Sequence, residues 1–153
     1  GLVIAYDNGG VNDRFRGRVI FPVHTLSGKV VAFGGRVLKK DEKTAKYVNS
    51  PESEIYHKSN ELYGIYFAKQ AIVKEDRCFL VEGYTDVISM HQAGFDNAVA
   101  SLGTAFTFGH AGIIKRYADE VYLAYDSDGA GVEATKKVIA ILREVGVGAR
   151  VII

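Results

Sequence analysis

Three carboxylates follow short apolar runs in this chain, at points where buried strands would end. Glu82 comes directly after the apolar run 78–81. Asp126 comes directly after the run 121–125, and Asp128 follows two residues later. In an open α/β sheet, ligands bind in the crevice outside the carboxyl ends of the strands, so these side chains can converge. Clustered anions repel one another unless a hard, oxygen-ligated cation such as Mg²⁺ lies between them. The pattern therefore indicates metal-assisted phosphoryl chemistry.

Local structural roles compete with this interpretation. Asp86 would lie in the first turn of a helix after Gly83, where a capping or helix-dipole interaction would also explain it. Glu82 would be partly buried at its strand end, and burial of a carboxylate without a partner is costly. An N-cap role explains one of Asp126 and Asp128 but not both, and the glutamate that completes a calcium loop is absent. The glycines that follow would allow a phosphate near the helix N-terminus.

The second half of the chain alternates between strand-like and helix-like segments. Apolar runs predict strands at 78–82, 97–101, 120–125 and 149–153. Spacing of apolar residues predicts helices at 84–93, 108–117 and 130–145. This alternation is typical of a mostly parallel sheet with right-handed crossovers, so we expect an α/β fold.

The first half has a different pattern. Residues 18–23 and 29–33 form a predicted hairpin, residues 38–60 are polar and irregular, and a helix is expected at 61–73. Residues 13–46 carry nine Lys or Arg and three Asp or Glu, which suits either a polyanionic ligand or a solvated hairpin. We expect a partial, basic α+β subdomain at 1–75 and the α/β subdomain at 76–153.

Composition excludes several protein classes. No apolar run approaches the length of a membrane span, and no basic-then-apolar signal peptide is present at the N-terminus, which favours a soluble intracellular protein. The single cysteine, Cys78, cannot form an internal disulfide or a cysteine-rich zinc site. We expect it to be a small buried apolar residue.

Several motifs, taken in order, resemble a known family. The acidic motifs 81–86 and 125–129 resemble the Toprim fold of primases, topoisomerases and some nucleases. The upstream motifs narrow this to the RNA-polymerase domain of bacterial DnaG-type replicative primases. These further motifs are residues 13–23 with Arg14-Phe15-Arg16-Gly17-Arg18, then Phe33-Gly34-Gly35-Arg36, Lys46-Tyr47-Val48-Asn49-Ser50-Pro51-Glu52, His57-Lys58, Leu62-Tyr63-Gly64 and Val99-Ala100-Ser101-Leu102-Gly103-Thr104.

The resemblance implies roles for matching residues. Glu82, Asp126 and Asp128 would be catalytic and would hold Mg²⁺ or Mn²⁺ near nucleotide phosphates, with Asp86 in the same metal site. Six basic residues would contact the template, the primer or the triphosphate: Arg14, Arg16, Arg18, Arg36, Lys46 and Lys58. The first three share one parity, so on a strand they would project from one face. Tyr84 and Phe106 could stack on a base, but packing in the core is the expected role of Phe106.

The resemblance also implies partners. These are a single-stranded DNA template, an RNA primer and ribonucleoside triphosphates, in the bacterial cytoplasm at the replisome or nucleoid, with no membrane. Zinc and the replicative helicase would bind family domains that are absent from this chain. The alternatives are a Toprim nuclease or topoisomerase-like strand cleaver, and a nucleic-acid-binding module without catalysis.

Overall fold

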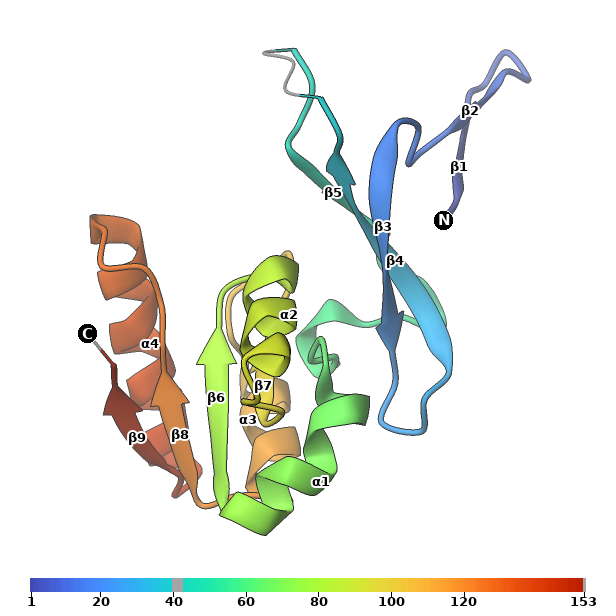
Figure 1. The fold of residues 1–153 in the computed structure, drawn as a ribbon. Helices are drawn as coiled ribbons and strands as arrows, with labels where there is room; N and C mark the ends of the chain where they lie inside the picture. The colour runs from blue at the N-terminus through green and yellow to red at the C-terminus, as the bar shows by residue number, and fades with distance from the viewer. Residues whose placement is uncertain (40–42, 153) are drawn as a thin grey trace.

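The computed structural model describes residues 1–39 and 43–152. Its strands belong to three sheets (Figure 1). The strands are β1 Val3–Ala5, β2 Val11–Asp13, β3 Arg18–His24, β4 Val30–Val37, β5 Tyr47–Asn49, β6 Arg77–Val81, β7 Ala98–Ala100, β8 Glu120–Leu123 and β9 Gly148–Val151. The helices are the 3₁₀ helix η1 Lys58–Asn60 and the α-helices α1 Ile65–Glu75, α2 Tyr84–Gln92, α3 Phe108–Lys115 and α4 Gly129–Glu144.

The C-terminal part, which we call the body, is a four-stranded parallel sheet with the order β7-β6-β8-β9. One face of this sheet packs with α1, α3 and α4 in a single apolar core that includes Leu80 and Leu123, both fully buried. Helix α2 lies on the other face, where Val87 packs near Val81. The predicted α/β class with a mostly parallel sheet is confirmed, and the four strands and three helices lie where their patterns placed them.

The N-terminal part contains an antiparallel sheet, β3-β4-β5, which we call the arm. It projects from the body, and the short β1–β2 hairpin lies at its far end (Figure 1). Among the described strands β3 pairs only with β4, so Pro22 lies on an edge strand, where its missing N–H costs no ladder bond. The turn before β4 contains Gly28 at φ 87°, a conformation that glycine adopts without strain.

Sequence patterns missed parts of this half. The predicted irregular stretch 38–60 contains β5 and η1. Residues 40–42 of that stretch lie outside the described residues, and so does residue 153 at the end of the predicted strand 149–153. The helix expected from residue 61 begins only at Ile65, because Tyr63 pairs with Ala100 of β7 and Gly64 takes φ 87°. Strand β5 and this bridge depend on contacts between distant segments, which local periodicity does not encode.

Cys78 is buried and free, as expected. No helix in the described residues is both long and apolar enough to cross a membrane. Helix α1 packs in the same apolar core as the parallel sheet, so packing joins it to the body although it precedes residue 76.

Candidate active site

Glu82 is the first residue after β6 and its side chain is exposed. The prediction of partial burial was wrong, because the strand ends at Val81 and the chain bends away from the sheet before α2. Its Oε1 accepts the backbone N–H of Asp126 at 2.9 Å. The carboxylate therefore connects the carboxyl ends of the neighbouring strands β6 and β8.

Asp128 is the N-cap of α4, and its Oδ1 accepts the N–H of Gly131 at 2.7 Å. The side chain of Asp126 makes no hydrogen bond within the described residues, although its backbone is held by Glu82. The N-cap reading therefore accounts for one of the two aspartates and leaves the other side chain exposed. A Cβ at position 131 would collide with the carbonyl oxygen of Asp126, so this glycine allows the loop to pack closely on the helix start.

Asp86 caps α2. Its Oδ2 accepts the N–H of Gly83 at 2.9 Å, which is the local capping role considered as an alternative. All four predicted site carboxylates thus follow the carboxyl ends of β6 and β8, and all four are exposed: Glu82, Asp86, Asp126 and Asp128.

A cavity of about 680 Å³ opens beside these carboxylates and is lined by Glu82 and Asp128. Ser101 and Tyr125 also line it, with Lys137 on α4. Burial raises the pKa of Tyr125 to about 12. The negative charge of Glu82 also raises this pKa, whereas a hydrogen bond with Ser101 lowers it. Tyr125 is therefore held in its protonated form, which is unfavourable for a nucleophile.

Ser101 was missed as a site residue. It follows β7, so the rule that found the carboxylates at the ends of β6 and β8 also applies to it. A serine after a run of small apolar residues carries no chemical signal of its own, because its usual roles are turns and caps.

The prediction that Arg14, Arg16 and Arg18 project from one face of a single strand is wrong. Arg14 and Arg16 lie in the turn between β2 and β3, and only Arg18 is on a strand. Arg18 donates from Nη1 to the carbonyls of Gly35 at 3.2 Å and Lys46 at 3.3 Å. The Nε of Arg14 is buried and has no hydrogen-bond partner within the described residues.

The remaining basic residues lie on two segments. Arg36 and Lys46 flank the ring of Tyr47, at 6.0 and 5.9 Å from its centroid, and both are exposed. Lys58 begins η1, and its carbonyl lies 2.7 Å from Nε2 of His110. Five of the six predicted basic residues thus belong to the arm or to the turn before it.

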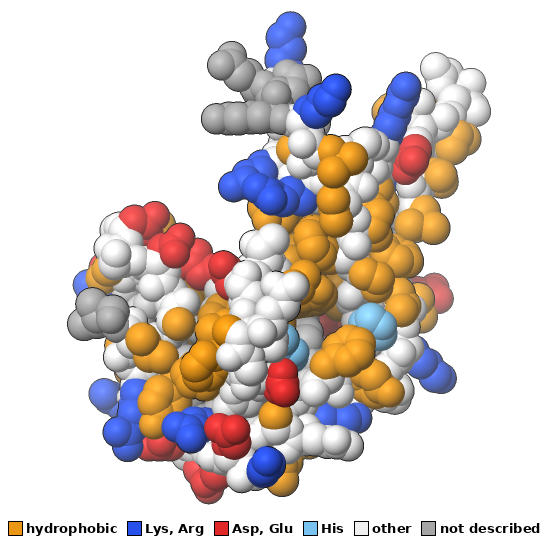
Figure 2. All heavy atoms as spheres, viewed as in Figure 1, with side chains coloured by type: hydrophobic (Ala, Val, Ile, Leu, Met, Phe, Trp, Pro, Cys, Tyr) orange, Lys and Arg blue, Asp and Glu red, His pale blue; other side chains and the backbone are white. Residues whose placement is uncertain are grey.

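Charges of opposite sign face each other across the concave side of the molecule. In Figure 2, acidic side chains gather on the upper rim of the body, and basic side chains gather on the arm above it, across the concave side of the molecule. A polyanion that lies on the arm can therefore reach the carboxylate edge without crossing the core.

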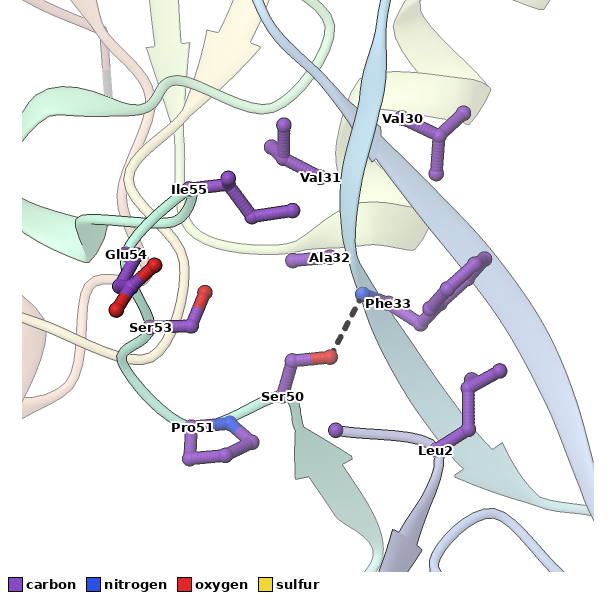
Figure 3. Close-up of a pocket in the computed structure, with 11 residues that line it drawn as sticks. Leu2, Val30, Val31, Ala32, Phe33, Ser50, Pro51, Ser53, Glu54 and Ile55 are labelled. Carbon is purple, nitrogen blue, oxygen red and sulfur yellow. Dashed lines mark hydrogen bonds between the residues drawn. The ribbon is translucent and has the colours of Figure 1, made fainter.

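A second cavity, of about 510 Å³, lies on the arm away from the carboxylates (Figure 3). It is lined by the start of β4, by Gly1 and Leu2, and by residues 50–51 and 53–55, among which Glu54 is the acidic residue. Ser50 Oγ accepts the N–H of Phe33 at 2.9 Å there. Its apolar lining offers few groups for phosphate chemistry.

Both halves of the chain match family models. Residues 1–69 match the N-terminal domain of the DNA primase catalytic core, and residues 79–153 match a Toprim-like family. The chain is 50% identical to a DNA primase of Clostridium acetobutylicum over 150 residues, which are 98% of this chain and 25% of that protein. The chain belongs to the DnaG-type primase family. It is also 46% identical to the DNA primase of Escherichia coli over 134 residues, 88% of this chain and 23% of that protein.

Solved primase structures share the fold. The zinc-binding and RNA-polymerase domains of the Aquifex aeolicus primase give a TM-score of 0.91 at 38% identity, over 98% of this chain and 37% of that one. The E. coli primase catalytic core gives 0.89 at 41% identity, over 98% of this chain and 48% of that one. The chain spans about a quarter of the length of the curated primases that it matches.

Proposed function

We propose that this chain forms the catalytic part of a bacterial primase that joins ribonucleoside triphosphates into RNA on a single-stranded DNA template. One observation carries the proposal: carboxylates at the ends of two adjacent parallel strands face a basic arm across one concave side. A primase catalytic domain, 40% identical to this chain, has been solved bound to single-stranded DNA, with a TM-score of 0.88 over 98% of this chain and 49% of that one.

A divalent cation fits the carboxylate edge by its chemistry. Among residues 1–39 and 43–152, no three His, Cys, Asp or Glu side chains already form a complete set of metal ligands. Mg²⁺ commonly takes only one or two protein carboxylates and completes its shell with water and substrate phosphates, so a complete set is not required. Glu82, Asp126 and Asp128 would hold Mg²⁺ or Mn²⁺, and Asp86 would contribute its oxygen that is not used in capping.

In this proposal the primer 3′-hydroxyl attacks the α-phosphate of the incoming nucleotide, and pyrophosphate leaves. The metal would lower the pKa of the attacking hydroxyl and neutralise charge on the phosphates. Glu82 holds the loop after β8 through the Asp126 N–H, so it fixes the spacing between the carboxylates as well as supplying one. Whether it also accepts the hydroxyl proton is a separate assignment.

The basic residues hold the polynucleotide. Arg14 lies in the turn before β3 and would contact a phosphate through the charged end of its guanidinium group. Arg16, Arg36 and Lys46 are exposed on the same arm, and with Arg18 and Lys58 they would position the template, the primer or the triphosphate. Zinc and the replicative helicase would be bound by other parts of the whole primase, which would act in the bacterial cytoplasm.

The test is a polymerisation assay with the full-length primase that contains this chain. Single-stranded DNA, ribonucleoside triphosphates and Mg²⁺ should yield short RNA products that require the template. Cleavage of the DNA strand would favour the nuclease or topoisomerase-like alternative. DNA binding without any product would favour a binding module instead.

A further inference from the structure

The arm and the body meet in a second apolar core, separate from the one under the parallel sheet. Phe21 and Ala32 of the arm pack there with Val81, Tyr84 and Val87 of the body. Tyr84 is the first residue of α2 and lies between two of the site carboxylates in sequence. It is only 3% exposed, so the prediction that it could stack on a base is wrong.

Tyr84 makes a polar contact inside this apolar junction. Its hydroxyl donates to Oδ1 of Asn49, the last residue of β5, at 2.6 Å. Its ring stacks on Phe21 with centroids 4.8 Å apart and planes 10° apart. The ring also lies where a Cβ at position 34 would be, so β4 can pass over it only because residue 34 is glycine.

The far side of Asn49 is fixed as well. A Cβ at Gly103, in the loop after β7, would come within 2.6 Å of the Asn49 amide nitrogen. The side chain of Asn49 is therefore confined between the start of α2 and the loop after β7. Both segments leave the carboxyl edge of the parallel sheet, which carries the site carboxylates. The Asn49 side chain therefore connects the arm to that edge.

The contact also lies beneath the cations of the arm. The ring of Tyr47, two residues before Asn49, stacks on Tyr84 at 6.2 Å and 25°. Arg36 and Lys46 lie over the Tyr47 ring. A continuous series of ring contacts thus joins two exposed basic residues to the start of α2.

We propose that the Tyr84–Asn49 hydrogen bond is a positioning contact that sets the angle of the basic arm over the carboxylate edge, so that a polynucleotide held by the arm reaches that edge. The hydrophobic stabilisation from the packing around it is non-directional. A hydrogen bond is directional, and its loss would leave the part-buried Asn49 oxygen unsatisfied. The role in catalysis rests on the proposed function, whereas the control of the angle does not.

The first test measures the angle directly. Spin labels at Leu38→Cys on the arm and Glu144→Cys on the body give a distance distribution, and the buried Cys78 should not react with the label. Tyr84→Phe and Asn49→Ala should broaden or shift the distribution. Tyr63→Phe is the matched control, because Tyr63 packs edge-on against Tyr84 at 4.7 Å but its hydroxyl has no hydrogen bond within the described residues. A narrow, unshifted distribution in both test variants would overturn the positioning role.

The second test uses binding, which a purely stabilising contact would not alter in folded protein. We expect oligo-dT affinity without metal to stay within about twofold in every variant, since the arm itself is intact. Addition of Mn²⁺ with a non-hydrolysable ATP analogue should tighten oligo-dT binding by the unmodified chain, and Tyr84→Phe should reduce that gain about five- to tenfold, as for one lost hydrogen bond. No gain in the unmodified chain would overturn the proposed function. A gain that Tyr84→Phe retains would overturn the positioning role alone.

Discussion

The body and the arm hold their charged side chains in different ways. At the edge of the body, Glu82, Asp86 and Asp128 each accept a backbone N–H from a strand end or helix start. On the arm, Arg16 has no hydrogen bond or ion pair within the described residues, and Arg36 lies loosely over an aromatic ring. Carboxylates held by backbone N–H groups suit chemistry at one position, whereas exposed cations without such bonds suit a backbone that must move past them.

The largest effect should come from the body. Glu82→Gln in the full-length primase should lower primer synthesis by about 10²–10³, the usual cost of removing one preorganised electrostatic element. The glutamine carbonyl can still accept the Asp126 N–H, so the loop after β8 should keep its place. Product formation is measured on a DNA template, and template affinity is the control. Near-normal synthesis with unchanged affinity would remove Glu82 from the catalytic role.

The junction between the two parts should be the next most sensitive place. Gly34→Ala would drive a methyl group into the Tyr84 ring, and overpacking of this kind costs about 1–3 kcal/mol in the free energy of unfolding. Gly112→Ala is the matched control, since it lies in α3 with open space around the added carbon and should stabilise by up to about 1 kcal/mol. Urea unfolding measures both. Equal effects would mean that the ring does not constrain β4.

Low pH should loosen the connection between η1 and α3. Nδ1 of His110 accepts the Thr107 N–H at 3.1 Å, so Nε2 carries the proton and donates to the Lys58 carbonyl at 2.7 Å. Burial lowers the pKa of His110 below its ordinary value of 6.5, although the backbone contacts at Lys58 and Glu61 oppose this.

Because the unfolded chain then binds a proton more readily, the stability that His110 contributes is present above pH 6.5 and is lost as the pH falls toward the folded-state pKa. Urea unfolding at several pH values should show this loss, and His110→Gln should flatten the profile in that window. An unchanged slope in the variant would assign the pH dependence to other groups.

The arm should give the smallest effects, spread over several residues. Arg16→Ala or Arg36→Ala should weaken single-stranded DNA binding similarly for all sequences, and each lost phosphate contact should reduce the log–log salt slope by roughly 0.7. Lys136→Ala on α4 is the control, since that exposed cation belongs to the body and pairs with Glu133. Without metal present, an unchanged slope in the combined arginine variants would mean that the template runs elsewhere.

The body could be predicted from sequence because its pattern is local. The run Cys78–Val81 is buried throughout, and the strand predicted at 78–82 forms at Arg77–Val81. The arm could not be predicted as fully. Strand β5 is three residues long and exists through its pairing with β4, and the turn around Arg16 breaks a parity that looked like a strand. The burial of Tyr84 could not be predicted because its partners, Phe21 and Asn49, are distant in the chain.

The central claim is that the carboxylate edge of the body is a divalent metal site. Mn²⁺ soaked into crystals of this chain, located by its anomalous signal, tests it most directly. The Asp126→Ala variant is the sharpest comparison, since the Asp126 side chain has no hydrogen bond to lose within the described residues. At Asp128 the matching variant is Asp128→Asn, because asparagine keeps an N-cap acceptor for the Gly131 N–H. We predict a peak beside Glu82, Asp126 and Asp128 that Asp126→Ala weakens. Saturating Mn²⁺ with no peak at this edge, or with an unchanged peak in the variant, would contradict the claim.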